Sequence, residues 1–126
     1  MLVAMKLCII DDNESITKMF SRLATMKGHE VTVANGGKNG LSILENQIFD
    51  ATVLDLSMPE FSGIDVVDAL NKSGKIKEQK IVILTASSEE DKVMNGLLEK
   101  GVRQCLKKPM PIHDILSILE NLAKQP

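Results

Sequence analysis

Short apolar runs and stretches of helical periodicity alternate along the chain. Five runs are apolar or alternating, rich in β-branched residues and bounded by turn residues, as is typical of buried strands. These runs span residues 7–10, 30–34, 51–55, 80–85 and 102–106. Between and after them, apolar residues recur at intervals of three and four, which indicates amphipathic helices. Helices are predicted over residues 14–27, around 41–46, around 64–70, over 93–98 and over 112–122.

Capping residues mark the ends of two of the predicted helices. Asn13 is a suitable N-cap for the first helix, and Gly28 ends it. Ser87 and Glu90 have the spacing of a capping box before the fourth helix, which Gly101 ends. The apolar stripe that the first helix is expected to bury comprises Ile16, Met19, Phe20, Leu23 and Ala24.

Strict alternation of strands and helices indicates an α/β fold. Such a pattern is satisfied by a parallel sheet with helices on both faces, joined by right-handed crossovers. A length of 126 residues and a hydrophobic content of 44% suit one core. We therefore predict a single domain over residues 1–126, built on a doubly wound parallel sheet of five strands.

Composition disfavours two classes of partner. A net charge of -2 and a pI near 5.7 provide no basic field for nucleic acid. No apolar run approaches the roughly 20 residues that span a membrane, and the N-terminus lacks the pattern of a signal peptide. Cys8 and Cys105 lie in strand-like runs without metal-ligand spacing, as small core residues do in a reducing compartment. We therefore expect a cytoplasmic protein that binds neither nucleic acid nor membrane.

Polar residues close four of the five predicted strands. They are Asp11 and Asp12 after the first strand, Asp55 at the end of the third, Thr85 at the end of the fourth, and Lys107 and Lys108 after the fifth. Because the carboxyl ends of parallel strands share one edge of the sheet, these side chains are expected to converge. Clustered carboxylates need a compensating cation, and oxygen ligands without His or Cys suit Mg²⁺ or Mn²⁺.

Together these strand ends resemble the receiver domain of two-component response regulators. The resemblance rests on four elements in order, namely the pair Asp11–Asp12, Asp55 followed by Pro59 and Gly63, Thr-Ala-Ser from Thr85, and Lys-Lys-Pro from Lys107. It covers nearly the whole chain. The resemblance implies a CheY-like (βα)5 domain with the flavodoxin-like strand order 2-1-3-4-5.

The resemblance also implies which residues bind metal and phosphate. Asp55 would be the phosphoacceptor, attacking the phosphorus of a phosphohistidine. Asp12, Asp55 and the backbone carbonyl of Ser57 would bind Mg²⁺ directly, and Asp11 would act largely through water.

Residues of the last two strands would contact the phosphoryl group. The resemblance selects Lys108, which precedes Pro109, as the residue that contacts the phosphoryl oxygens, and it implies a cis bond between the two. Lys107 would point away, because adjacent strand residues face opposite sides. The side chain of Thr85 and the backbone of Ala86 would hydrogen-bond the phosphoryl group.

One position departs from the family pattern. The family usually has Tyr or Phe three residues before the active-site Lys, whereas this sequence has Cys105. The resemblance therefore does not supply the usual aromatic switch. His29 and His113 flank predicted elements outside the cluster, and we expect loop or capping roles for them.

Three functions are compatible with this pattern. The first is a stand-alone switch, a monomer or weak homodimer that is phosphorylated by a sensor histidine kinase and contacts a downstream protein. It would catalyse only its own phosphorylation and dephosphorylation, so it would not be an enzyme, and it could equally be a phosphorelay intermediate that passes phosphate to a histidine phosphotransfer protein. The second is an Asp-nucleophile phosphohydrolase, although Ser57 stands where an acid or base is needed. The third, a flavodoxin-like ligand module, would need a glycine-rich phosphate loop in place of Asp11 and Asp12.

Overall fold

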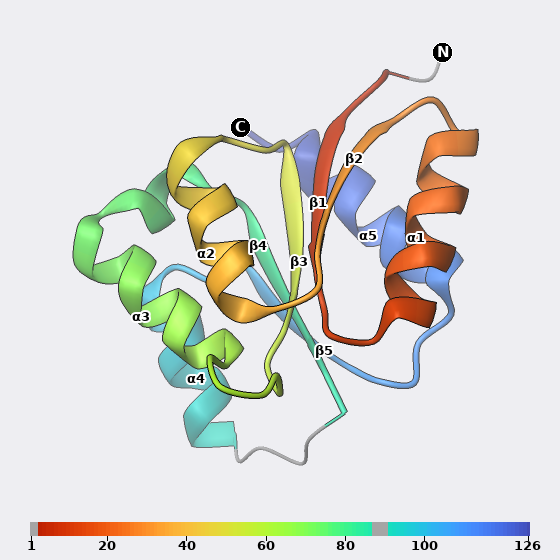
Figure 1. Ribbon diagram of the computed structural model, residues 1–126. Coiled ribbons are helices and arrows are strands. Elements are labelled where there is room, and N and C mark those ends of the chain that lie inside the picture. The colour runs from red at the N-terminus through yellow and green to blue at the C-terminus, as the bar shows by residue number, and fades with distance from the viewer. Residues whose placement is uncertain (1–2, 87–90) are drawn as a thin grey trace.

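Strands and helices alternate along the chain, as the sequence predicts (Figure 1). The computed structural model describes residues 3–86 and 91–126. Its strands are β1 (Lys6–Ile10), β2 (Glu30–Ala34), β3 (Ala51–Asp55), β4 (Ile81–Thr85) and β5 (Gln104–Lys107). Its helices are α1 (Glu14–Met26), α2 (Gly37–Asn46), α3 (Gly63–Ser73), α4 (Asp91–Lys100) and α5 (Ile112–Ala123), and a short 3-10 helix, η1 (Lys75–Glu78), follows α3.

The strands form one sheet in the order β2-β1-β3-β4-β5. Each neighbouring pair within the described residues is parallel, with Ile9 opposite Val53 and Val53 opposite Val82. The predicted flavodoxin-like order 2-1-3-4-5 is therefore confirmed. Parallel pairing also places the carboxyl ends of β1, β3, β4 and β5 along one edge of the sheet.

Helices cover both faces of the sheet (Figure 1). Helices α1 and α5 pack on one face, against a core that includes Ile9, Val53 and Leu84. Helices α2, α3 and α4 pack on the other face, against a core that includes Ile10 and Ile83. Every residue of β3 is buried, because this central strand is covered on both sides. No helix in the described parts of the chain is long and apolar enough to cross a membrane.

Helix α2 begins earlier than predicted. The sequence places its start near residue 41, whereas the helix begins at Gly37. A Cβ on Gly37 would lie 2.0 Å from the carbonyl oxygen of Phe61, and one on Gly40 would lie 2.6 Å from Cγ2 of Ile10. These two glycines therefore allow α2 to approach its neighbours closely and do not form a flexible loop.

The buried stripe of α1 differs from the predicted one at two positions. Phe20 and Ala24 are buried as expected, but Met19 is 59% exposed. Thr17 is buried instead, and its hydroxyl, which has one hydrogen to donate, lies 3.1 Å from the carbonyl oxygen of Glu14 and 3.2 Å from Oδ1 of Asn35. A hydroxyl with two acceptors can be buried at little cost, so the stripe includes a polar residue that an apolar pattern does not reveal.

Helix caps agree with the sequence where the structure describes them. The Asn13 side chain accepts from the first-turn amides of α1, and Gly28 has the expected left-handed φ of 91°. The predicted capping box of Ser87 and Glu90 lies outside the described residues. A further capping box, which was not predicted, begins α3, where Ser62 and Asp65 exchange hydrogen bonds between side chain and backbone.

His29 lies in the connection between α1 and β2, as expected for a loop residue, but it is buried there. Its Nδ1 accepts from the amide of Met5 at 3.1 Å, so its Nε2 donates to Glu120 of α5 at 2.7 Å. Glu120 also accepts from Lys27 at 3.2 Å. Burial raises the pKa of Glu120, but these two hydrogen bonds outweigh it and leave the pKa below its usual value. The cluster links the residue before β1 and the α1–β2 connection to α5.

The two thiols form no disulfide. Cys8 is fully buried in β1, and burial raises its pKa to about 12. Cys105 is half-buried in β5, where it packs against the core beneath α2, α3 and α4, and burial raises its pKa as well. Both residues therefore behave as small core residues, as predicted from their sequence context.

Candidate functional site

Three carboxylates meet at the carboxyl edge of the sheet. Asp11 and Asp12 follow β1 and Asp55 ends β3, and one oxygen from each lies within 4.8 Å of the others. The two strands are neighbours, and pairing of Ile10 with Leu54 brings the residues that follow them side by side. Asp11 and Asp55 are only 2% and 4% exposed, whereas Asp12 faces solvent. The predicted convergence of these acids is therefore present.

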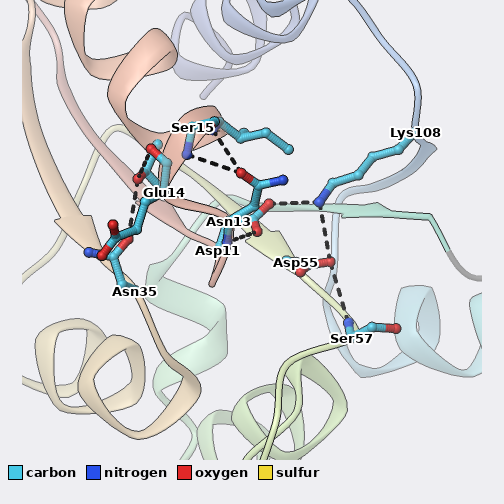
Figure 2. A network of polar contacts seen from close by, with 10 residues as sticks. Asp11, Asn13, Glu14, Ser15, Asn35, Asp55, Ser57 and Lys108 are labelled. Atoms are coloured by element: carbon cyan, nitrogen blue, oxygen red, sulfur yellow. Dashed lines mark hydrogen bonds and ion pairs between the residues drawn. The ribbon is translucent and has the colours of Figure 1, made fainter.

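Lys108 reaches into the same cluster from the end of β5 (Figure 2). Its Nζ lies 2.9 Å from Oδ2 of Asp11 and 3.8 Å from Oδ1 of Asp55. Lys107 is exposed. The bond between Lys108 and Pro109 is cis, as the family resemblance implied. The structure thus selects between two adjacent lysines that the alternation of strand residues alone did not distinguish.

Backbone amides hold the two buried carboxylates in place (Figure 2). The amide of Asn13 donates to Oδ1 of Asp11 at 2.9 Å, and the amide of Ser57 donates to Oδ1 of Asp55 at 3.4 Å. In each case the donor is two residues after the acid, which is the spacing of an Asx turn. From the sequence, Asn13 is predicted only as a helix cap. Asp11, two residues before that cap, is the signal that could have revealed that the backbone amide of Asn13 also binds a carboxylate.

Thr85 and Ala86 lie on the same edge of the sheet. Thr85 is the buried last residue of β4, one position beyond the residue that pairs with Asp55. Its carbonyl accepts from the amide of Lys108 at 2.8 Å, which ties the end of β4 to the lysine. Ala86 follows and is exposed. This edge of the sheet therefore has a small, exposed residue, Ala86, next to the strand end that carries Thr85.

The connection after Asp55 is tightly packed. A Cβ on Gly63 would lie 2.4 Å from the carbonyl oxygen of Asp55 and 2.8 Å from Cα of Leu56. The amide of Gly63 donates to the carbonyl of Leu56 at 2.9 Å. Within this connection Glu60 has a φ of 67°, in the left-handed region that non-glycine residues seldom adopt. The first turn of α3 is thus held directly against the end of β3.

Electrostatics make this cluster suitable for a cation. Burial and the neighbouring charge of Asp11 raise the pKa of Asp55 to about 6, although Lys108 and the amide of Ser57 act in the opposite direction. The single ammonium of Lys108 does not balance the charges of the three acids. Oxygen ligands with surplus negative charge, one of them open to solvent, fit a hard divalent ion such as Mg²⁺.

The raised pKa of Asp55 has a consequence for stability without metal. A carboxylate whose pKa rises from 3.8 to about 6 on folding destabilises the folded state above pH 6, and this penalty disappears below about pH 4. Asp55→Asn is therefore expected to raise the free energy of unfolding at pH 7.5 by about 3 kcal/mol. Urea unfolding in EDTA, followed by circular dichroism at pH 7.5 and pH 4, measures both values. A gain that is equal at the two pH values would contradict the assigned cause.

The sequence matches the response regulator receiver domain family over residues 7–120. Among curated relatives, the transcriptional regulatory protein CpxR of Escherichia coli K12 is 31% identical over 121 residues, which are 95% of this chain and 50% of that protein. The chain spans about half the length of the first curated relatives that it matches.

Solved receiver domains have the same fold. The receiver domain of Francisella response regulator 1452 superposes with a TM-score of 0.83 at 26% identity, covering 95% of this chain and 97% of that one. The receiver domain of sensor histidine kinase PA1611 from Pseudomonas aeruginosa PAO1 has a TM-score of 0.80 at 20% identity, covering 98% and 100%. That second structure contains a magnesium ion coordinated in its active site cleft.

Proposed function

Because the chain belongs to the response regulator receiver domain family of two-component systems, we propose that Asp55 accepts a phosphoryl group from a sensor histidine kinase in a Mg²⁺-dependent reaction. One observation carries the proposal: the buried Asp55 carboxylate lies within 4.8 Å of two further acids and 3.8 Å from the ammonium of Lys108. Receiver domains are phosphoryl-accepting switches, and residues 1–126 would act as one such unit.

The Asp55 carboxylate is the proposed nucleophile. One of its oxygens bonds to phosphorus while the bond from phosphorus to the imidazole nitrogen of the donor breaks, and the imidazole leaves with the electron pair and takes up a proton. Asp11, Asp12 and Asp55 would hold Mg²⁺, together with the backbone carbonyl of Ser57. When bound, the ion neutralises charge on the phosphoryl oxygens.

Three further residues are proposed to hold the phosphoryl group. Lys108 already lies between Asp11 and Asp55, so its ammonium can transfer from the carboxylates to a phosphoryl oxygen. The hydroxyl of Thr85 and the amide of Ala86 are at the adjacent strand end, where they would donate to the other oxygens. The exposed, small side chain of Ala86 leaves room for the donor to approach.

Phosphorylation by a small donor tests the proposal. Incubation with acetyl phosphate and Mg²⁺ is expected to add one phosphate per chain, detected by intact-protein mass spectrometry and removed by hydroxylamine, as an acyl phosphate would be. EDTA should prevent the modification. An unmodified protein under conditions that phosphorylate a control receiver domain would refute the proposal.

Lys108→Ala is expected to separate phosphorylation from the response to it. Labelling should persist, because the nucleophile and the three acids remain. Amide chemical-shift changes caused by beryllofluoride should become smaller, because the ammonium no longer moves toward the phosphoryl position. Lys107→Ala, which changes the adjacent exposed residue, is the matched control and should respond as the wild type does. Equal responses of wild type and Lys108→Ala would exclude the proposed role.

Output through contact with another protein is part of the proposal. A phosphorelay role would differ only in the next step, transfer of the phosphate to a histidine phosphotransfer protein. Incubating the phosphorylated chain with such a protein and following the label distinguishes the two. Multiple turnover of phosphate monoesters would instead favour the phosphohydrolase alternative.

A further inference from the structure

A groove of about 290 Å³ lies between α3 and α4, on the face of the sheet opposite α1 and α5. The residues that line it are Ile64, Lys92, Val93, Gly96, Leu97 and Lys100. Leu97 is buried, and Ile64 and Val93 are half-buried, so the floor is apolar and partly open to solvent. Lys92 and Lys100 lie at its border. The groove is therefore an apolar surface with two lysines along its α4 side.

Gly96 lines this groove and lies in the interior of α4. A glycine in a helix interior costs roughly 0.5–1 kcal/mol relative to alanine. At Gly37, Gly40 and Gly63, a Cβ would come within 3 Å of a neighbouring atom, whereas a Cβ on Gly96 would meet nothing within 4 Å. Packing within the chain therefore does not require glycine at position 96. The missing side chain instead keeps the groove open beside Gly96.

The two lysines of the groove lie on the same face of α4 as Gly96. Lys92, Gly96 and Lys100 are spaced four residues apart, so the two lysines lie one turn on either side of the glycine. Lys100 contacts Asp68 of α3 at 2.6 Å, but both side chains are substantially exposed, 39% and 51%, respectively. Ion pairs at such exposure contribute little and exchange readily with other partners. A carboxylate from outside can therefore replace Asp68.

We propose that the α3–α4 groove binds a short amphipathic helix of a downstream protein. Its apolar side chains would cover Ile64, Val93 and Leu97, and its carboxylates would face Lys92 and Lys100. Two cations along the α4 side of an apolar floor favour an acidic over a basic helix, and the open space at Gly96 can take an apolar side chain of that helix. The identification of the bound protein as the output target rests on the proposed signalling function. The existence of the binding surface does not depend on that function.

A synthetic helical peptide provides the probe. It presents leucines at positions i, i+3, i+4 and i+7 with glutamates elsewhere, and a second peptide replaces the glutamates by lysines. Each peptide is titrated into ¹⁵N-labelled protein. The acidic peptide is expected to shift the amide resonances of α3 and α4, and the basic peptide is expected to bind at least tenfold more weakly, a difference of roughly 1.4 kcal/mol. Equal binding of both peptides, or shifts confined to other elements, would overturn the proposal.

Substitutions identify the groove as the binding surface. Gly96→Leu fills the gap and is expected to weaken binding of the acidic peptide at least roughly tenfold. The fold should be kept, because its Cβ has free space. Asn95→Leu adds the same side chain to the adjacent exposed position and should bind as the wild type does. The double variant Lys92→Glu, Lys100→Glu should reverse the preference toward the basic peptide. Undiminished binding by Gly96→Leu would overturn the proposal.

Failure of this inference can be distinguished from failure of the proposed function. Phosphorylation by acetyl phosphate is measured separately on the same variants, none of which alters the acid cluster. Normal phosphorylation without peptide binding would refute the groove and leave the switch intact. Peptide binding without phosphorylation would support the groove and refute the switch.

Discussion

Asp55→Asn is expected to abolish phosphorylation by acetyl phosphate. A neutral amide oxygen is a poor nucleophile toward phosphorus, and the substitution also removes one of the three acidic oxygens that lie within 4.8 Å of one another. Intact-protein mass spectrometry after incubation with Mg²⁺ and the donor measures the modified fraction. That fraction should fall to the level seen without donor.

The matched control for this variant is Asp68→Asn, which removes an exposed acid of α3 that is not part of the cluster. It should be phosphorylated as the wild type is. The folded state of Asp55→Asn is checked by its circular dichroism and by the gain in stability expected at neutral pH. If Asp55→Asn were folded and still phosphorylated, another residue would be the acceptor and the proposed role of Asp55 would be wrong.

Gly63→Ala is expected to lower the free energy of unfolding by about 1–3 kcal/mol, the usual cost of overpacking. The new Cβ would lie 2.4 Å from the carbonyl oxygen of Asp55, and this contact cannot be relieved by rotating a side chain because the neighbouring atoms belong to the backbone. Displacing the connection after Asp55 should also weaken Mg²⁺ binding, measured by calorimetry. Unfolding in urea is best followed by circular dichroism, since the chain contains no Trp or Tyr.

Gly96→Ala provides the control for this second variant. It also adds one methyl group to a helical glycine, but the methyl group meets nothing within 4 Å. The helix propensity of alanine should then raise the stability by roughly 0.5–1 kcal/mol. Opposite signs for the two variants would establish that close packing against β3 causes the loss. Gly63→Ala with unchanged stability and Mg²⁺ affinity would contradict that cause.

The local pattern predicted most of the fold because buried strands and amphipathic helices have different periods. It did not predict contacts between distant segments. Gly37 illustrates the difference. A glycine-rich stretch is locally typical of a loop, but residue 37 is in a helix, and a side chain there would collide with the carbonyl oxygen of Phe61, which belongs to another connection. Strand order also came from the family resemblance, because periodicity alone is compatible with several orders.

The site was predictable for a different reason, namely that parallel strands end at a common edge. This rule brought Asp11 and Asp55 together across 44 residues of sequence without any knowledge of their contacts. It could not distinguish Lys108 from Lys107, which depends on the path of the chain before Pro109. Nor could it reveal the burial of His29, whose partner Glu120 is 91 residues away.

The attachment of α5 determines how this helix can respond to events at the acid cluster. Near its C-terminus, Glu120 is joined to His29 and Lys27, and Lys80 donates to the carbonyls of Leu122, Ala123 and Gln125. At its N-terminus, the helix begins only four residues after Lys108. A displacement of Lys108 would therefore reach the start of α5 first, whereas the contacts of Glu120 and Lys80 hold the other end of the helix in place.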